Sequence, residues 1–340
     1  MPDDKRLKLL MDVAKMHYVD KLTKTEIANK IQTSSTHVGR LLQEAESKKV
    51  VQFTFTPPRL SGLQDQLIER FPFVTEAIVV GSGDDYEFQL QALGTAAAGY
   101  FEQCVEAQAG AKIGISGGRT LRAMVQALPR RQRDITLCPT ALIGLGPFMP
   151  AHIDPMVLIS LLWHKSGRPE HGAYCATILP FDPGPKKRRF KELRDEYRSH
   201  CDRQKNNSKV QFVLNEMHNV DIVFASLGPI PLPAEYRRGT TVLELLKDIE
   251  VTEDVLRNAG VVGDISYEFF DRDGNAREDW DFFLALGVEH YRKMSADSRK
   301  KVVMIAGKYK VDALGALLRG KLCNVLITDS TTAEKLLMDS

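Results

Sequence analysis

Residues 22–49 constrain the fold more than any other stretch of this 340-residue chain. They contain two short runs with helical spacing of apolar residues, separated by the polar break Gln32-Thr33-Ser34. The second run places four apolar residues at i, i+3, i+4 and i+7, namely Val38, Leu41, Leu42 and Ala45. The break is too short to leave the helices independent, and its threonine and serine can cap the second helix. Two short helices joined this tightly predict a helix-turn-helix.

The second helix keeps a polar face beside its apolar stripe. In a helix-turn-helix this helix contacts base edges with its N-terminal residues. Arginine can make a bidentate contact to guanine, and hydroxyl groups can reach bases or phosphates. We therefore predict DNA contacts for Ser35, Thr36, His37 and Arg40 of this helix, and we also predict one for Thr25, which precedes the break. The alternative is an ordinary helical hairpin whose polar face is solvated.

The flanking sequence extends this prediction to a winged domain. An apolar-periodic helix is expected over residues 5–19, and residues 50–55 alternate as a strand does. Residues 1–56 hold ten Lys and Arg against seven Asp and Glu, a local surplus of three that permits phosphate contact. The whole chain has a net charge of +2, so global charge gives no argument for nucleic acid. Prolines 57 and 58 suit a stiff hinge after this domain.

From residue 76 onward, strand-like apolar runs alternate with helical patterns. The expected strands are 77–80, 112–115, 135–137, 141–143, 175–179, 221–225, 303–306 and 324–327. The expected helices are 63–71, 86–105, 119–128, 154–164, 311–318 and 330–337. This alternation predicts an α/β fold with a Rossmann-like, mostly parallel sheet covered by helices on both faces. Ligands of such sheets bind at the carboxyl ends of the strands.

One strand end carries a candidate anion site. The expected strand at 112–115 runs into Ser116-Gly117-Gly118-Arg119-Thr120, and a helix follows. Glycines let the backbone approach an anion, and a helix N-terminus presents N–H groups and a positive dipole end. Arg119 adds a planar charged fork and Thr120 a hydroxyl, both suited to phosphate. The loop is neither a Walker loop nor a GxGxxG fingerprint, and the alternative is a tight turn with Arg119 exposed.

Two further turns are expected at strand ends. Gly263-Asp264-Ile265 could place Asp264 to accept hydrogen bonds from sugar hydroxyls, or to cap a turn. The loop after Ala306 could bring Lys310 to a phosphate, or leave it solvated. The predicted effector-binding residues are Ser116, Gly117, Gly118, Arg119, Thr120, Asp264, Gly307 and Lys310.

These motifs resemble the SorC (sorbitol-operon) family of sugar-binding transcriptional regulators. The similar segments span nearly the whole chain: 22–58, GISGGRTL at 114–121, GDI at 263–265, FFDRDG at 269–274 and the tail at 302–337. The family pairs an N-terminal helix-turn-helix with a domain similar to sugar-phosphate isomerases and deaminases. The resemblance implies a cytoplasmic bacterial regulator, commonly tetrameric, whose operator affinity is set by a phosphorylated sugar or similar metabolite.

The resemblance also implies roles for the candidate residues. Loop 116–120 would hold the phosphate, Asp264 would contact hydroxyls, and Lys310 would reach the anionic or carbonyl end of the ligand. The chain departs from the family where Ser116 replaces a usual glycine and Gly117 a commonly bulky residue. The loop after Ala306 is one residue short, so the ligand contact is Lys308 or Lys310. Residues 165–209 are longer than usual.

We accordingly predict a helix-turn-helix DNA-binding domain at 1–56, a linker and coupling helix at 57–72, and an effector-binding and oligomerisation domain at 73–340. The expected partners are double-stranded operator DNA, a phosphorylated sugar or related small molecule, and further copies of the chain in a dimer or tetramer. No cofactor, metal or membrane contact is expected. The five scattered cysteines are typical of reduced structural thiols and not of a zinc site.

Two other functions are compatible with the sequence. The first is a sugar-phosphate isomerase or deaminase with an attached DNA-binding domain, which would need an acid/base pair such as Asp264 with His290 or His152. No motif ties these residues together, so no catalytic residue is predicted. The second is a constitutive DNA-binding scaffold that has lost its ligand.

Overall fold

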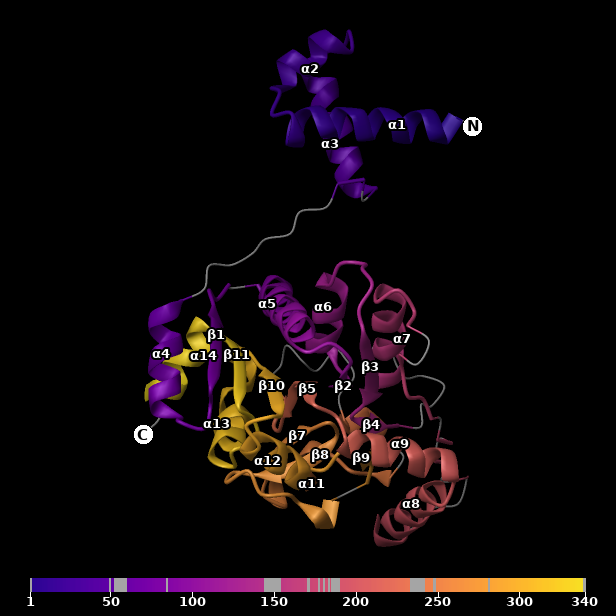
Figure 1. Cartoon of the computed structure of the whole chain (residues 1–340), viewed down its shortest axis with the longest axis vertical. Coiled ribbons are helices and arrows are strands. Elements are labelled where there is room, and N and C mark those ends of the chain that lie inside the picture. Colours follow the sequence, from indigo (N-terminus) through magenta and orange to yellow (C-terminus); the bar gives the residue numbers. More distant parts are fainter. Residues whose placement is uncertain are drawn as a thin grey trace. The chain divides into compact units, whose positions relative to one another are not determined.

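The computed structural model describes residues 2–48, 50–51, 60–83, 85–143, 154–169, 172–176, 178–179, 181–182, 184, 190–232, 242–246, 249–280 and 282–338. The chain divides into two compact units, Met1–Phe55 and Thr56–Ser340, called here the N-terminal and C-terminal units (Figure 1). Each unit has a buried apolar core of its own.

The N-terminal unit is helical in its described part. It consists of α1 (Pro2–Ala14), a π-helical turn η1 (Lys15–Val19), α2 (Lys24–Lys30) and α3 (Ser35–Ser47). The predicted helix pair and its cap are confirmed, since the Ser34 side chain accepts a hydrogen bond from the His37 N–H at the start of α3. Thr23 and Glu26 form a capping box at the start of α2.

The predicted wing strand has no described counterpart. Val50 and Val51 form a bend and not a strand, while residues 52–55 and the hinge prolines at 57 and 58 lie outside the described residues.

The C-terminal unit is built on a six-stranded sheet in which every neighbouring pair is parallel. In spatial order its strands are β1 (Glu76–Val80), β11 (Val325–Asp329), β10 (Lys301–Ile305), β5 (Ile222–Ala225), β2 (Ala111–Ile115) and β3 (Ile135–Pro139). All six strands therefore end at the same edge of the sheet, and the loops that follow them are brought together there.

Helices cover both faces of this sheet, as predicted (Figure 1). One face packs on α5 (Tyr86–Ala107), α6 (Arg119–Ala127) and α7 (Pro155–Lys165). The other packs on α4 (Ser61–Arg70), α9 (Ser208–His218), α12 (Val288–Ala296), α13 (Val311–Arg319) and α14 (Ser330–Met338). Successive strand residues point to opposite faces, so Ile78 and Val80 join the first core while Ala77 and Val79 join the second.

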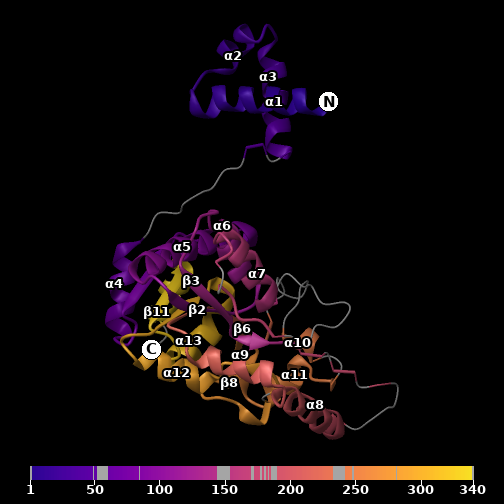
Figure 2. The same ribbon diagram turned by 45° about the vertical axis from the view of Figure 1, so that its right-hand side comes forward.

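A smaller antiparallel sheet follows directly from β5. It comprises β6 (Leu227–Pro229), β7 (Val261–Ile265) and β8 (Glu268–Asp271), and a separate pair joins β4 (Ala141–Leu142) to β9 (Leu284–Ala285). The remaining described elements are α8 (Phe190–Lys205), α10 (Val242–Leu245), α11 (Glu253–Asn258), η5 (Glu278–Trp280) and η6 (Lys308–Lys310). In Figure 2, α8, α10 and α11 lie at the lower right of the C-terminal unit.

Two local predictions were wrong. The described residues of 175–179 are irregular: nearby, only Ala173 bridges Leu137 of β3, and the apolar character of Ile178 reflects burial in the core and not strand pairing. Gly263-Asp264-Ile265 is not a turn but the end of β7. The turn is formed by Ser266 and Tyr267, whose positive φ angles of 49° and 70° close the β7–β8 hairpin.

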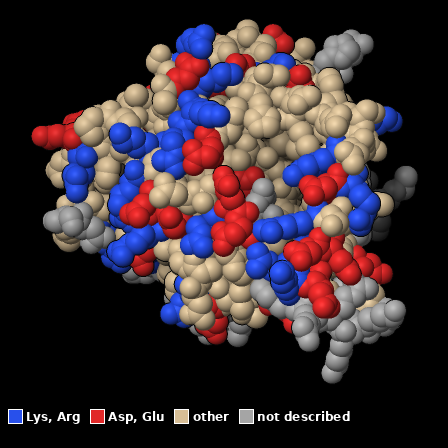
Figure 3. All heavy atoms as spheres, turned by 90° about the horizontal axis from the view of Figure 1, so that it is seen from below, with Lys and Arg blue, Asp and Glu red and all other residues tan. Residues whose placement is uncertain are grey.

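Charges of both signs are interspersed on the face of the C-terminal unit seen in Figure 3. Within the part of the chain that the structure describes, no helix has the length and apolar character needed to cross a bilayer.

Candidate functional site

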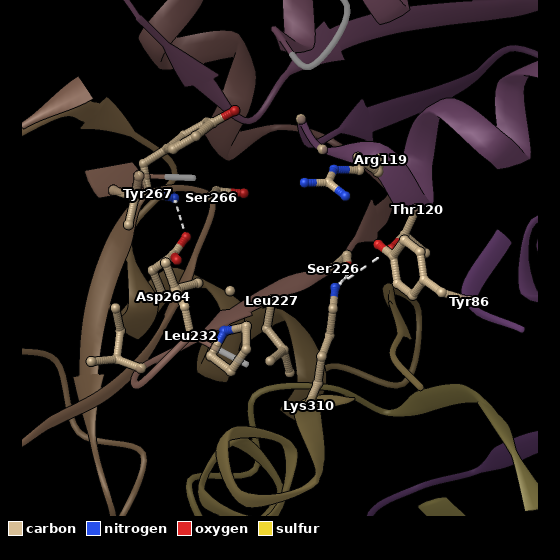
Figure 4. Close-up of a pocket in the computed structure, with 16 residues that line it drawn as sticks. Tyr86, Arg119, Thr120, Ser226, Leu227, Leu232, Asp264, Ser266, Tyr267 and Lys310 are labelled. Carbon is tan, nitrogen blue, oxygen red and sulfur yellow. Dashed lines mark hydrogen bonds between the residues drawn. The ribbon is translucent and has the colours of Figure 1, made fainter. Parts of the chain in front are cut away.

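A cavity opens at the edge where the parallel strands end (Figure 4). Its polar lining comes from residues that directly follow strands or lie in the small sheet: Gly117, Gly118, Arg119, Thr120, Ser226, Asp264, Ser266 and Lys310. Tyr86 from the start of α5 and Tyr267 from the β7–β8 turn add aromatic walls. The cavity volume of about 100 Å³ is enough for several water molecules.

The start of α6 forms one wall. Its N-cap is Gly118, whose φ of 110° would be strained for any residue with a side chain. As a glycine, this N-cap has no side chain that could accept a hydrogen bond from the first N–H groups of the helix. A helix N-terminus without a side-chain cap favours an anion. Arg119 extends from the first turn into the cavity, with its guanidinium carbon 5.9 Å from the centre of the Tyr86 ring.

Lys310 lies beside this wall and is only 7% exposed. It ends the short helix η6 after β10, and its Nζ donates to Ser226 Oγ at 2.6 Å and to Thr120 Oγ1 at 3.4 Å (Figure 4). Burial lowers the pKa of Lys310 to about 8; Asp264 opposes this shift and Arg119 adds to it. Two cationic side chains and a helix N-terminus therefore share one side of the cavity.

Asp264 forms the opposite wall and is 8% exposed. Its Oδ2 accepts the Tyr267 N–H at 3.2 Å, and Gly228 on the neighbouring strand leaves it room, since a Cβ there would lie 2.1 Å from Oδ1. Burial raises the pKa of Asp264 to about 7, against the lowering effects of the Tyr267 N–H and of Lys310. A carboxyl group with that pKa can both donate and accept a hydrogen bond near neutral pH.

Ser266 lines the cavity on the same side as Asp264, and its hydroxyl is bonded to two residues outside the lining, Thr140 and Tyr291. Ser266 Oγ lies 2.7 Å from Thr140 Oγ1 and 2.6 Å from Tyr291 Oη, all three side chains being buried. The cavity thus joins a basic wall, suited to an anionic group, to a wall of hydroxyl and carboxyl groups suited to ligand hydroxyls.

The structure brings most of the predicted effector residues together. Gly117, Gly118, Arg119, Thr120, Asp264 and Lys310 line the cavity. Ser116 does not, because it is buried behind the loop, where its Oγ accepts the Ser226 N–H at 3.4 Å. Gly307 does not either, because it packs on Asp329, and a Cβ there would lie 2.7 Å from the Asp329 carboxylate.

Of the two lysines that the sequence left open, Lys310 faces this cavity and Lys308 turns away. The Lys308 Nζ donates to the Gly83 carbonyl at 3.0 Å. Four lining residues named above were not predicted from the sequence: Tyr86, Ser226, Ser266 and Tyr267. Ser226 and Tyr86 follow the parallel strands β5 and β1, so their positions after strands were a usable signal.

Of the two acid/base pairs considered for an enzyme, the one between described residues, Asp264 with His290, is not assembled. His290 is absent from the cavity lining and packs edge-to-face on His218, with ring centres 4.6 Å apart. Burial lowers the pKa of His290 to about 4, with further lowering from His218, Lys293 and Lys300. His152 lies outside the described residues. Among the residues that are described, no three His, Cys, Asp or Glu side chains are placed to hold a metal ion.

Four of the five predicted DNA-binding residues gather around one shallow hollow of the N-terminal unit: Thr25, Ser35, Thr36 and Arg40. All four are exposed. His37 is half-buried and lies outside this hollow. The hollow spans α2 and α3, so the two helices present one continuous polar surface.

The fold and the cavity define a class: a ligand-binding α/β domain on a chain that also carries a helix-turn-helix. The chain belongs to the family described as "Putative sugar-binding domain", whose model matches residues 57–153 and 200–338. The predicted resemblance to SorC-type regulators is confirmed.

Similar proteins span nearly the whole chain. The deoxyribonucleoside regulator of Bacillus subtilis is 23% identical over 99% of both chains. The erythritol catabolism regulatory protein EryD of Brucella abortus is 25% identical, over 97% of this chain and 96% of its own. The crystal structure of the full-length sorbitol operon regulator SorC from Klebsiella pneumoniae matches 97% of this chain and 98% of its own, with a TM-score of 0.66 and 21% identity. All three are named as regulators and none as an enzyme.

Proposed function

We propose that this protein is a DNA-binding transcriptional regulator whose operator affinity is controlled by a phosphorylated sugar or related metabolite. The observation that carries the proposal is the cavity with Arg119 and Lys310 on one side and Asp264 on the other, in a chain that also holds an exposed helix-turn-helix surface. Similarity to named regulators of sorbitol, deoxyribonucleoside and erythritol metabolism supports the same function.

The metabolite would bind with its phosphate at the start of α6. Backbone N–H groups of the first turn, the Arg119 guanidinium and the Lys310 ammonium all favour a dianionic group there. Asp264 and Ser266 would then meet the hydroxyls at the other end of the ligand. This orientation places every charge of the ligand opposite a charge of the protein.

The DNA would be a double-stranded operator contacted by α3. Thr25, Ser35, Thr36 and Arg40 are exposed around one hollow, and Arg40 would contact guanine from the major groove. His37 would add a contact at the edge of this surface. We expect the protein to act in the cytoplasm. We also expect a homodimer or homotetramer, because operators with two-fold symmetry bind paired copies of such a helix.

The segment 57–72 would couple the two functions. Its described part contains α4, which packs against β1 and the core of the C-terminal unit. Residues 73–340 would hold the effector and the contacts between copies.

Thermal unfolding of the full chain tests the proposal. The panel contains sorbitol 6-phosphate, deoxyribose 5-phosphate and erythritol 4-phosphate, each beside its unphosphorylated form and inorganic phosphate. A phosphate ester at about a hundredfold its Kd should raise the melting temperature by about 5 °C, and the unphosphorylated form should raise it far less. Equal shifts with both forms, or a shift that persists in Lys310→Met, would place the ligand elsewhere.

A further inference from the structure

The carboxylate of Asp329 lies at the end of β11, next to the cavity but outside its lining. Asp329 is fully buried. Its oxygens accept hydrogen bonds from Ser82 Oγ at 2.9 Å, from the Lys308 N–H at 2.8 Å and from the Gln89 side chain. They also accept the N–H and the hydroxyl of Thr332, at 2.9 Å and 3.0 Å. Five donors from four separate segments therefore meet on one side chain.

Lys308 connects this carboxylate to the cavity. It begins η6, the three-residue helix that ends at Lys310, so a shift of Lys310 on ligand binding moves the Lys308 backbone as well. Besides its backbone bond to Asp329, Lys308 reaches across with Nζ to the carbonyl of Gly83. A second contact joins η6 to the start of α5, because the Tyr309 ring packs edge-to-face on Tyr86 with ring centres 5.6 Å apart.

Ser82 connects the same carboxylate to the start of the C-terminal unit. Its hydroxyl donates to Asp329, and its N–H donates to Ser330 Oγ at 3.2 Å. Ser82 lies two residues after β1. Two hydrogen bonds join β1 to the chain segment that precedes it. The Leu60 N–H donates to the Val79 carbonyl at 3.0 Å, and the Val79 N–H donates to Gln64 Oε1 at 3.2 Å.

The packing around this connection leaves little freedom. Gly307 sits against Asp329 so closely that a Cβ would lie 2.7 Å from the carboxylate and 2.9 Å from Leu93. Close-packed interiors transmit displacements because they cannot deform continuously. A change at Lys310 therefore has a short, rigid route to Leu60, the first described residue after the segment 52–59 that joins the two units.

We propose that Lys308, the Ser82-Gly83 loop and Asp329 form a junction in which the Lys308 Nζ bond to the Gly83 carbonyl transmits a change at Lys310 in the cavity to Leu60 and Val79, and thereby regulates DNA binding. The inference rests on the proposed function for its biological meaning. Lys308 is a positioning residue: it lies outside the lining of the cavity and acts through the Gly83 loop.

A double-mutant cycle without any ligand tests the junction in the full chain. Lys310→Met perturbs the cavity by removing both Nζ hydrogen bonds, and Lys308→Met removes the bond to Gly83 while keeping the backbone bond to Asp329. Hydrogen exchange is followed by mass spectrometry in peptides covering 60–67 and 76–83. Lys310→Met should change their exchange rates by about threefold or more in the wild-type background, and much less in the Lys308→Met background.

Two controls separate coupling from general loosening. Lys112→Met removes a similar lysine at the opposite end of the sheet, where its Nζ bonds Glu216 at 2.7 Å, and should leave the Lys310→Met effect intact. Lys308→Arg keeps a cationic donor and should restore the effect. Equal effects of Lys310→Met in the wild-type and Lys308→Met backgrounds, or no effect in the wild type, would overturn the proposal. Because no metabolite is used, failure to find an effector would count against the proposed function and not against the junction.

Discussion

On α3 of the N-terminal unit, Ser35, Thr36 and Arg40 are exposed, whereas in the cavity of the C-terminal unit Lys310 and Asp264 are 7% and 8% exposed. Exposed polar groups cost the fold little and remain free to meet a large partner such as a duplex. Buried charges destabilise the free protein, yet in a low-dielectric cavity they attract a ligand more strongly. DNA recognition and effector recognition should therefore respond differently to mutation and to pH.

The largest effect is expected in the buried site. Lys310→Met should weaken binding of a phosphate ester by about 2–5 kcal/mol, because the phosphate would lose a desolvated cationic partner. Wild-type affinity should also fall as the pH rises above about 8, where Lys310 loses its proton. Isothermal titration calorimetry measures both. Lys112→Met is the matched control, since that Nζ bonds Glu216 outside the cavity, and an equal loss in both variants would refute the assignment of Lys310.

A pH-dependent effect on stability should follow from Asp264. Its pKa in the folded protein, about 7, lies above the ordinary value of 3.8, so the folded state holds a proton that the unfolded state releases between those pH values. Wild-type stability is therefore lost progressively as the pH rises from about 4 to about 7. Asp264→Asn lacks this loss, so its melting temperature relative to wild type should increase over that window by about 10 °C, because a shift of about three pKa units is worth about 4 kcal/mol.

Asp297 gives the control of opposite sign. Its hydrogen bonds with Arg299 lower its pKa to about 2, so its contribution is present at neutral pH and is lost as the pH falls. Asp297→Asn should therefore be slightly less stable than wild type at neutral pH and approach it in acid. If Asp264→Asn followed that same trend, the burial argument for Asp264 would be wrong.

The exposed site should show a loss of affinity without a loss of stability. Arg40→Ala should weaken binding to the protein's own promoter by about 1–3 kcal/mol and relax its sequence preference, while the melting temperature stays unchanged. Fluorescence anisotropy with promoter and random duplexes measures this. Lys8→Ala on α1 is the control, an exposed cation outside the hollow. Promoter binding that survives Arg40→Ala would remove α3 as the recognition helix.

The smallest effect is expected at the cap of α3. Ser34→Ala removes the acceptor for the His37 N–H and should destabilise the N-terminal unit by about 1 kcal/mol, typical of a lost N-cap. Ser35→Ala, one residue on, removes an exposed hydroxyl and should leave stability unchanged while weakening DNA binding. Chemical denaturation followed by circular dichroism distinguishes the two. A stable Ser34→Ala variant would mean that tertiary packing, and not the cap, fixes the start of α3.

The sequence predicted what local patterns control. The helix pair follows from the apolar spacing of Val38, Leu41 and Leu42, and the parallel strands follow from continuous apolar runs such as Ile222–Ala225. The small antiparallel sheet was missed because Leu227-Gly228-Pro229 is too short and too rich in glycine and proline to show a strand pattern. The glycine beside Asp264 likewise obscured the strand pattern of β7, so Asp264 was assigned to a turn.

The cavity was only partly predictable. Loops after parallel strands must meet at one edge, so the positions of Arg119 and Lys310 near each other follow from topology. Which of Lys308 and Lys310 faces the cavity depends on the winding of η6, a three-residue helix that no sequence pattern specifies. Ser116 and Gly307 were predicted to bind the ligand from their positions after strands. In the structure, Ser116 instead accepts a hydrogen bond from Ser226, and Gly307 packs against Asp329.

Operator binding measured with and without a metabolite tests the central claim most directly. A labelled fragment of the protein's own promoter is titrated with the full chain, in the absence and presence of the phosphate ester that raises the melting temperature most. If a metabolite regulates DNA binding, the apparent Kd for the promoter should change by about 5–150-fold, which corresponds to a coupling free energy of about 1–3 kcal/mol. The apparent Kd of Lys310→Met should not change. An identical Kd with and without that ester, or equal affinity for promoter and random DNA, would contradict the account.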